Sequence, residues 1–116
     1  MNSLRNRVTL IGRLGAKADV KRFDDGKVKA TINLATNDFY KNQKGENVEE
    51  TTWHYVVAWG KSAEIIEKYT DKGSEIAVDG KLSNRSYTDK DGTKKYITEV
   101  VVDNVVLLGE KVHANS

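Results

Sequence analysis

The sequence contains no cysteine and no proline, and both absences narrow the possible structures. Without cysteine the chain forms no disulfide, no thiolate metal site and no thiol nucleophile. Without proline, nothing interrupts the hydrogen-bond ladder of a long β-strand. The sequence also lacks a signal-peptide pattern and any apolar run near the ~20 residues that a membrane-spanning helix needs. These absences fit a reducing cytosol without requiring one, and we expect a cytoplasmic protein with no membrane partner.

An excess of charge of one sign is lacking as well. The chain of 116 residues has 19 Lys and Arg against 17 Asp and Glu, which gives a formal net charge of +2. A strongly basic domain indicates a nucleic-acid partner by charge alone, and this sequence does not. If the chain binds nucleic acid, its cations must be placed locally and assisted by uncharged side chains.

What the sequence does contain is a series of two-residue alternations of apolar and polar side chains, which are typical of β-strands. They predict strands at residues 8–14, 27–34, 51–59, 75–85 and 94–108. A polar stretch at 37–50 is either a long loop or a protruding hairpin. A helix is expected over about 62–72, with Ser62 as its N-cap and Gly73 as its stop.

This element order predicts the fold class. Five strands with one short helix between the third and the fourth is the arrangement of the OB-fold, an all-β barrel. We assign residues 1–109 to this single domain and residues 110–116 to a polar C-terminal stub.

No residues form a convincing catalytic or metal-binding set. The two histidines, His54 and His113, lie in a strand and in the polar C-terminal stub, and the acidic residues are scattered or flank turn glycines. The glycines do not have the spacing of a phosphate-binding loop. The sequence therefore predicts a protein that is not an enzyme, with no catalytic residue, no metal ligand and no cofactor.

Large rings recur on one side of the strand at 51–59. Trp53, Tyr55 and Trp59 share a face because even separations along a strand point the same way, and Val56 and Ala58 take the other face. Exposed rings next to cations such as Lys61 and Arg85 form a platform for stacking the bases of a single strand. The pattern alone leaves open the alternative that these rings pack inside the barrel.

Five ordered blocks carry a family resemblance that covers residues 6–109. They are NRVTLIGRLG, INLATNDFY, WHYVVAWGK, KGSEIAVDGKLSNRSYTDKDG and TEVVVDNVVLLG, of which the third is the most specific. With these blocks at these spacings, the sequence resembles the bacterial single-stranded DNA-binding protein family.

The resemblance implies a role for each matching aromatic residue. Trp53 and Trp59 match two base-stacking positions of the family on its third strand. Tyr40 and Tyr87 match positions that often hold tryptophan, so stacking there is expected to persist with a smaller ring. Tyr55, where a basic residue is common, is counted with the binding face.

The resemblance also implies phosphate contacts and a subunit contact. Lys61 and Lys72 match lysines that the family places near phosphates, and we add Arg85 to the nucleic-acid-binding set. His54 matches a histidine at a subunit interface, and a homotetramer is expected because the family usually forms one. Tyr55 and Ser86 both reduce the local positive charge relative to the family pattern.

The function implied is sequence-tolerant binding and protection of single-stranded DNA in replication, recombination and repair. The family usually continues into an acidic C-terminal tail that recruits replication and repair proteins, and the sequence instead ends at Ser116. Such partners are expected only where a longer form carries that tail. Two alternatives stay open: a dimeric primosomal accessory protein with the same fold, and an OB-fold module whose partner is a protein or RNA.

Overall fold

The structure is a computed structural model in which residues 4–108 are described. The elements are β1 (Val8–Leu14), β2 (Asp19–Arg22), β3 (Val28–Lys41), β4 (Asn47–Trp59), α1 (Gly60–Tyr69), β5 (Glu75–Thr88) and β6 (Lys94–Leu107). The five long strands with one helix between the third and fourth of them match the predicted OB-fold barrel. The stub at 110–116, with His113, lies outside the described residues.

A single sheet in the order β1-β5-β6-β4-β3-β2 closes on itself through a further pairing of β1 with β3. The neighbours pair antiparallel except β4 and β6, which run parallel through Val56–Val100 and Val57–Val101. The closing pairs are Arg13–Ala35 and Leu14–Leu34. Gly12 permits this closure, because a Cβ atom there would lie 2.2 Å from the carbonyl oxygen of Ala35.

The barrel interior is filled by aliphatic side chains from all five long strands and from α1. The fully buried residues of largest volume in this core are Leu34, Val56, Ile66, Ile76 and Val78. The alternation predicted for the strands places these side chains inward and leaves polar ones outside. No helix within residues 4–108 has the length and apolar content needed to cross a membrane.

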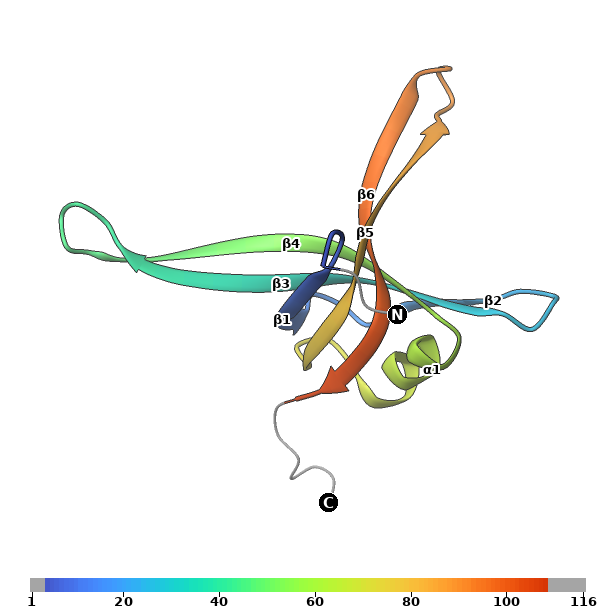
Figure 1. Cartoon of the computed structure of the whole chain (residues 1–116), viewed down its shortest axis with the longest axis horizontal. Helices are drawn as coiled ribbons and strands as arrows, with labels where there is room; N and C mark the ends of the chain where they lie inside the picture. Colours follow the sequence, from blue (N-terminus) through green and yellow to red (C-terminus); the bar gives the residue numbers. More distant parts are fainter. Residues whose placement is uncertain (1–3, 109–116) are drawn as a thin grey trace.

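Two hairpins extend beyond the barrel. Figure 1 shows the β3–β4 ribbon and the β5–β6 ribbon running away from it in different directions. The stretch at 37–50 is therefore a protruding hairpin, since β3 continues to Lys41 and β4 begins at Asn47. Its residues are polar because both faces of a two-stranded arm meet solvent.

The helix and one strand differ from the sequence-based expectations. Ser62 is not the N-cap; α1 begins at Gly60, after Trp59 in an extended conformation, and ends at Tyr69 before Thr70. Gly73 instead occupies the following turn at φ +87° and donates its N–H to Leu14. The sequence analysis missed β2, a four-residue edge strand whose side chains are exposed or only half-buried.

Candidate nucleic-acid interface

The C-terminal half of β4 has two different sides. Val56 and Ala58 point into the barrel and are 0% and 1% exposed, whereas Trp53 and Trp59 are 59% and 44% exposed on the outer side. Side chains alternate along a strand, so Tyr55 shares the outer side with both tryptophans. The alternative that the rings fill the core is therefore wrong, because the smaller side chains take the interior.

The outer side of β4 continues across β6 onto β5. Glu99 lies two residues before Val101, the partner of Val57, so it points outward beside Tyr55. Arg85 on β5 donates from Nε to Glu99 Oε1 at 3.0 Å, which places it on the same side. Tyr87 follows Arg85 by two residues. We call the outer surface formed by Trp53, Tyr55, Trp59, Arg85 and Tyr87 the ring face.

Trp59 stands in a group of aromatic and basic side chains. Phe23 stacks with it at a centroid distance of 6.0 Å and an interplanar angle of 25°, and Lys29 Nζ lies 5.7 Å from its ring centroid. A hollow of about 810 Å³ opens beside it, lined also by Lys27 and Lys61. A flat ring can stack on a base, the hollow leaves room for it, and the cations can bind its phosphate.

Trp53 lies over the chain that follows β1. A Cβ atom on Gly15 would come within 2.5 Å of the Trp53 indole, so this glycine lets the ring lie close to the backbone. A hollow of about 310 Å³ beside the ring is lined by Gly15, Ala16 and Asn33. One part of the Trp53 indole therefore packs against the backbone at Gly15, and another part borders the open hollow.

Two of the expected binding residues are not brought to the ring face. Tyr40 is exposed, but it lies on the same face of the β3–β4 ribbon as His54. Leu34 is the register partner of His54, and Tyr40 lies an even number of residues after Leu34 on β3, so both point to that face. Lys72 lies after α1, in a separate hollow of about 330 Å³ that Arg13 also lines. Their predicted roles require a DNA path longer than the ring face.

The cations near the ring face differ in their pairing. Lys29 and Lys61 form no ion pair with another residue within 4–108. Arg85 does form one, and the hydrogen bond and negative charge of Glu99 raise the pKa of Arg85 above its ordinary value, with a smaller contribution from Tyr55. Lys29 and Lys61 are thus two unpaired charges beside Trp59.

His54, the expected subunit-contact residue, is half-buried on the opposite side of β4 from the tryptophans. Its Nε2 lies 3.0 Å from the Thr36 hydroxyl. In the described part of the chain, no three His, Asp or Glu side chains gather as a metal ion would require.

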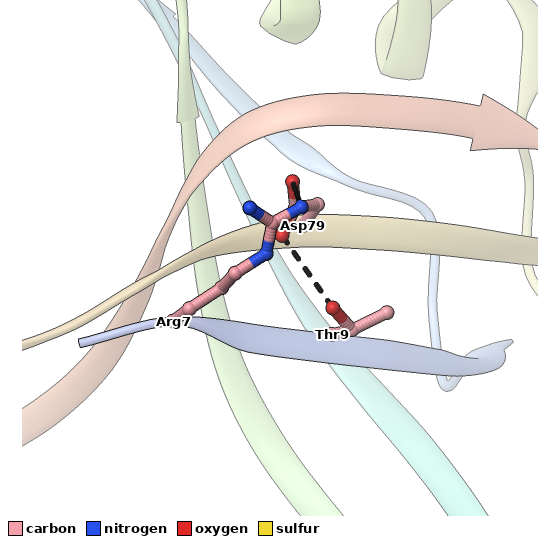
Figure 2. Close-up of polar contacts among 3 residues, drawn as sticks. All are labelled: Arg7, Thr9 and Asp79. Carbon is pink, nitrogen blue, oxygen red and sulfur yellow. Dashed lines mark hydrogen bonds and ion pairs between the residues drawn. The ribbon is translucent and has the colours of Figure 1, made fainter. Parts of the chain in front are cut away.

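A second exposed surface crosses β1, β5 and β6. Ile11 pairs with Ala77 and Ala77 with Val106, so the three side chains form a line that we call the apolar row. Ile11 and Val106 are 57% and 55% exposed. Figure 2 shows the polar group beside it, where Asp79 accepts from Arg7 at 2.9 Å and from Thr9 at 3.5 Å. Charges are paired along this surface.

The sequence analysis missed Phe23, Lys29 and Glu99 as members of the site. Lys29 is the partner of Trp59 in the β3–β4 register. Its position on the solvent-exposed face of a predicted strand was a signal that could have placed it in the site. Phe23 gave none, because its contact with Trp59 joins elements distant in the chain. Glu99 and Arg85 lie on the consecutive strands β5 and β6, and their contact depends on the register of that hairpin.

Comparison with known proteins shows which family the chain resembles. Residues 5–108 match the model of a family described as the single-strand binding protein family. The chain is 43% identical to single-stranded DNA-binding protein 1 of Xylella fastidiosa, with 91% of this chain and 79% of the relative covered. It is 44% identical to the single-stranded DNA-binding protein of Bacteroides thetaiotaomicron, with 91% and 67% covered.

A solved structure is also similar. It is that of a Plasmodium falciparum SSB complex with ssDNA, which superposes with a TM-score of 0.82 at 32% identity. The superposition covers 94% of this chain and 98% of that chain.

Proposed function

The chain belongs to the single-strand binding protein family, and we propose that it binds single-stranded DNA with little sequence preference and protects it. The resemblance found in the sequence is confirmed by the family match over residues 5–108. Members of this family bind nucleic acid and catalyse no reaction, so the chain is not an enzyme.

The proposed mechanism is base stacking on the ring face. The observation that carries it is the outward placement of Trp53 and Trp59 on a strand whose inner side is filled by Val56 and Ala58. Every base has a flat face, so stacking tolerates sequence and contributes about 1–3 kcal/mol per base. Tyr55 and Tyr87 extend the same surface.

Phosphate contacts supply the remaining affinity in this proposal. Lys61 borders the hollow beside Trp59, and Lys29 stands over the same ring. In this proposal the bound DNA continues from the ring face toward Lys72 at one end and toward Tyr40 on the β3–β4 hairpin at the other. Local cations of this kind compensate for a net charge of only +2.

We propose a homotetramer in which the apolar row and the surroundings of His54 form two different contacts. A tetramer with dihedral symmetry needs at least two kinds of self-complementary interface. The apolar row offers one, because Ile11 and Val106 expose apolar area between paired charges. His54 faces away from the rings, so a contact there leaves the ring face open.

The biological setting follows from the binding activity. We propose a cytoplasmic protein that coats single strands exposed in replication, recombination and repair, and that meets replication and repair enzymes only where an acidic C-terminal tail is present. A dimer in solution would instead favour the primosomal accessory protein. Preference for RNA or for a protein partner would favour the interaction module.

The proposal is tested by fluorescence anisotropy with labelled oligonucleotides of equal length. Oligo-dT and a mixed-sequence single strand are expected to bind with similar affinity, and the duplex of that mixed sequence much more weakly. Oligo-U serves as the RNA comparison. Equal affinity for the duplex, or no binding to either single strand, would contradict the proposal.

A further inference from the structure

A buried carboxylate lies within the ring face. Glu99 is 8% exposed, and among the described residues it is the one charged residue with an exposure this low. Its side chain points to the outer side of β6, toward the surface that we propose binds a polyanion. A negative charge in that place is unfavourable for binding phosphate unless another group neutralises it.

Arg85 is the group that neutralises it. The Arg85 Nε–H donates to Glu99 Oε1 at 3.0 Å, from a neighbouring strand on which Ser83 is the direct partner of Glu99. The Arg85 side chain is 44% exposed and that of Glu99 is 9% exposed. The carboxylate is thus beneath the surface, and the guanidinium covers it.

The geometry of this pair limits what Arg85 can do. Because the bond uses Nε, Glu99 does not engage the two terminal amino groups of the planar guanidinium, and Tyr55 beside them interacts with Arg85 more weakly than Glu99 does. A phosphate at those groups would also meet the Glu99 charge, which lies within hydrogen-bond distance of the same guanidinium. A neutral base edge or base face meets no such repulsion, and guanidinium groups stack well on flat rings.

We propose that Glu99 is a positioning residue that fixes Arg85 on the ring face and withholds its charge from phosphates, so that Arg85 contacts a base. This inference rests on the proposed binding of single-stranded DNA. It divides the cations near the rings into two groups: Lys29 and Lys61, which carry uncompensated charge, and Arg85, which provides a flat polar surface of no net charge together with Glu99.

The dependence of affinity on salt separates a phosphate contact from a base contact. Each phosphate that a protein neutralises on a single strand changes the slope of log affinity against log salt by about −0.7. Between 50 and 200 mM salt, one additional contact therefore weakens binding by about 2.6-fold more. An oligo-dT of about eight nucleotides suits the measurement, since one OB-fold covers ~4–16.

Three variants are compared with the wild type. Glu99→Gln keeps an oxygen that accepts from Arg85 but removes the charge, and it is expected to steepen the slope by about 0.7 because Arg85 becomes available to phosphate. The double variant Arg85→Gln/Glu99→Gln is expected to keep the wild-type slope and to lose affinity by the same factor at both salt concentrations. Lys61→Gln, the matched control, is expected to flatten the slope by about 0.7.

Each outcome decides the inference. A double variant with a slope flatter by about 0.7 would mean that Arg85 already contacts a phosphate and would overturn it. An unchanged slope in Glu99→Gln, or an unchanged affinity in the double variant, would overturn it as well. These failures differ from failure of the proposed function, in which the wild type itself would not bind oligo-dT at low salt.

Discussion

The ring face and the apolar row are both exposed, but their cations differ in pairing among the described residues: the ring face has unpaired lysines beside its Arg85–Glu99 ion pair, whereas Arg7 and Arg13 beside the apolar row are both paired. On the ring face, Lys29 and Lys61 stand beside exposed indole rings without an ion pair to another described residue. Beside the apolar row, two arginines are paired, Arg7 with Asp79 at 2.9 Å and Arg13 with Glu75 at 4.0 Å.

This difference indicates two kinds of partner. A polyanion with flat bases gains from unpaired cations and from rings, and it finds both on the ring face. A protein surface gains from apolar area with few uncompensated charges at its centre, which is what the apolar row offers. Net charge alone could not make this distinction, because both surfaces contribute cations to the same total.

The largest expected effect follows from a charge placed in the apolar row. Ile11→Glu should abolish the proposed tetramer, since an unpaired carboxylate would be buried in an apolar contact, while the 57% exposed side chain lets the single chain stay folded. Light scattering after size-exclusion chromatography measures the mass. Lys17→Glu, an exposed change outside the row, is the control and should leave the tetramer intact.

If the Ile11→Glu protein had the same mass in solution as the wild type, the apolar row would not be part of the proposed tetramer interface. Its affinity for a short oligo-dT should remain close to that of the wild type, because the ring face belongs to one chain. Loss of short-oligonucleotide binding in a folded variant would mean that the two surfaces are not independent.

Next in size is removal of one indole ring. Trp53→Ala should weaken oligo-dT binding by about 5- to 140-fold, which corresponds to a loss of about 1–3 kcal/mol of stacking. Trp53→Phe keeps a flat ring and should lose much less. Anisotropy titration at one salt concentration gives both values, and equal losses in the two variants would show that stacking is not what Trp53 contributes.

A smaller effect should distinguish the two faces of the β5–β6 hairpin. Tyr87 shares the side of Arg85, whereas Tyr96 pairs with Ser86 and points to the other side. Tyr87→Ala should weaken binding several-fold, with its phenol ring offering less area than an indole. Tyr96→Ala, the matched control on a more exposed ring, should bind as the wild type does. Equal losses would mean that the strand contacts both sides of the hairpin.

The smallest effect concerns an ion pair outside both surfaces. Arg22 donates to Glu67 at 2.6 and 3.0 Å and joins β2 to α1. This hydrogen bond lowers the pKa of Glu67 from its usual value of 4.5. The folded-state pKa is below the unfolded one, so the stabilisation is present above about pH 4.5 and is lost as pH falls through the folded pKa.

Thermal unfolding of wild type and Glu67→Gln from pH 7 down to pH 3 measures this effect. The wild type should have the higher Tm at pH 7, and the difference should disappear toward pH 3. Affinity for oligo-dT at pH 7 should be equal in the two proteins. A difference in Tm that persisted at pH 3 would assign the stabilisation to something other than the ionised pair.

Much of the fold was predictable, because alternation along the strands and the helix position are local properties. The prediction failed where tertiary contacts decide. Trp59, in an extended conformation, directly precedes α1 without a side-chain cap, so Ser62 in the sequence gave a false start signal. The four residues of β2 carry no apolar alternation long enough to detect.

The candidate site likewise has features that local sequence patterns predict and features that only tertiary contacts decide. The even spacing of Trp53 and Trp59 on one strand predicted that they share a side, but the pattern left open whether that side faces outward, which the burial of Val56 and Ala58 decides. The contact of Phe23 with Trp59 depends on the strand order, which no local pattern contains, and the contact of Glu99 with Arg85 depends on the register of the β5–β6 hairpin. Tyr40 shows the limit of resemblance, because its matching position does not state which face of the β3–β4 ribbon it occupies.

The most direct test of the ring face is the intrinsic fluorescence of the two tryptophans during titration with oligo-dT, at low and at high salt. Both indoles lie on the ring face, so stacking should quench them strongly, with log affinity falling against log salt at about −0.7 per phosphate neutralised. Unchanged fluorescence at saturating oligo-dT would contradict stacking on Trp53 and Trp59.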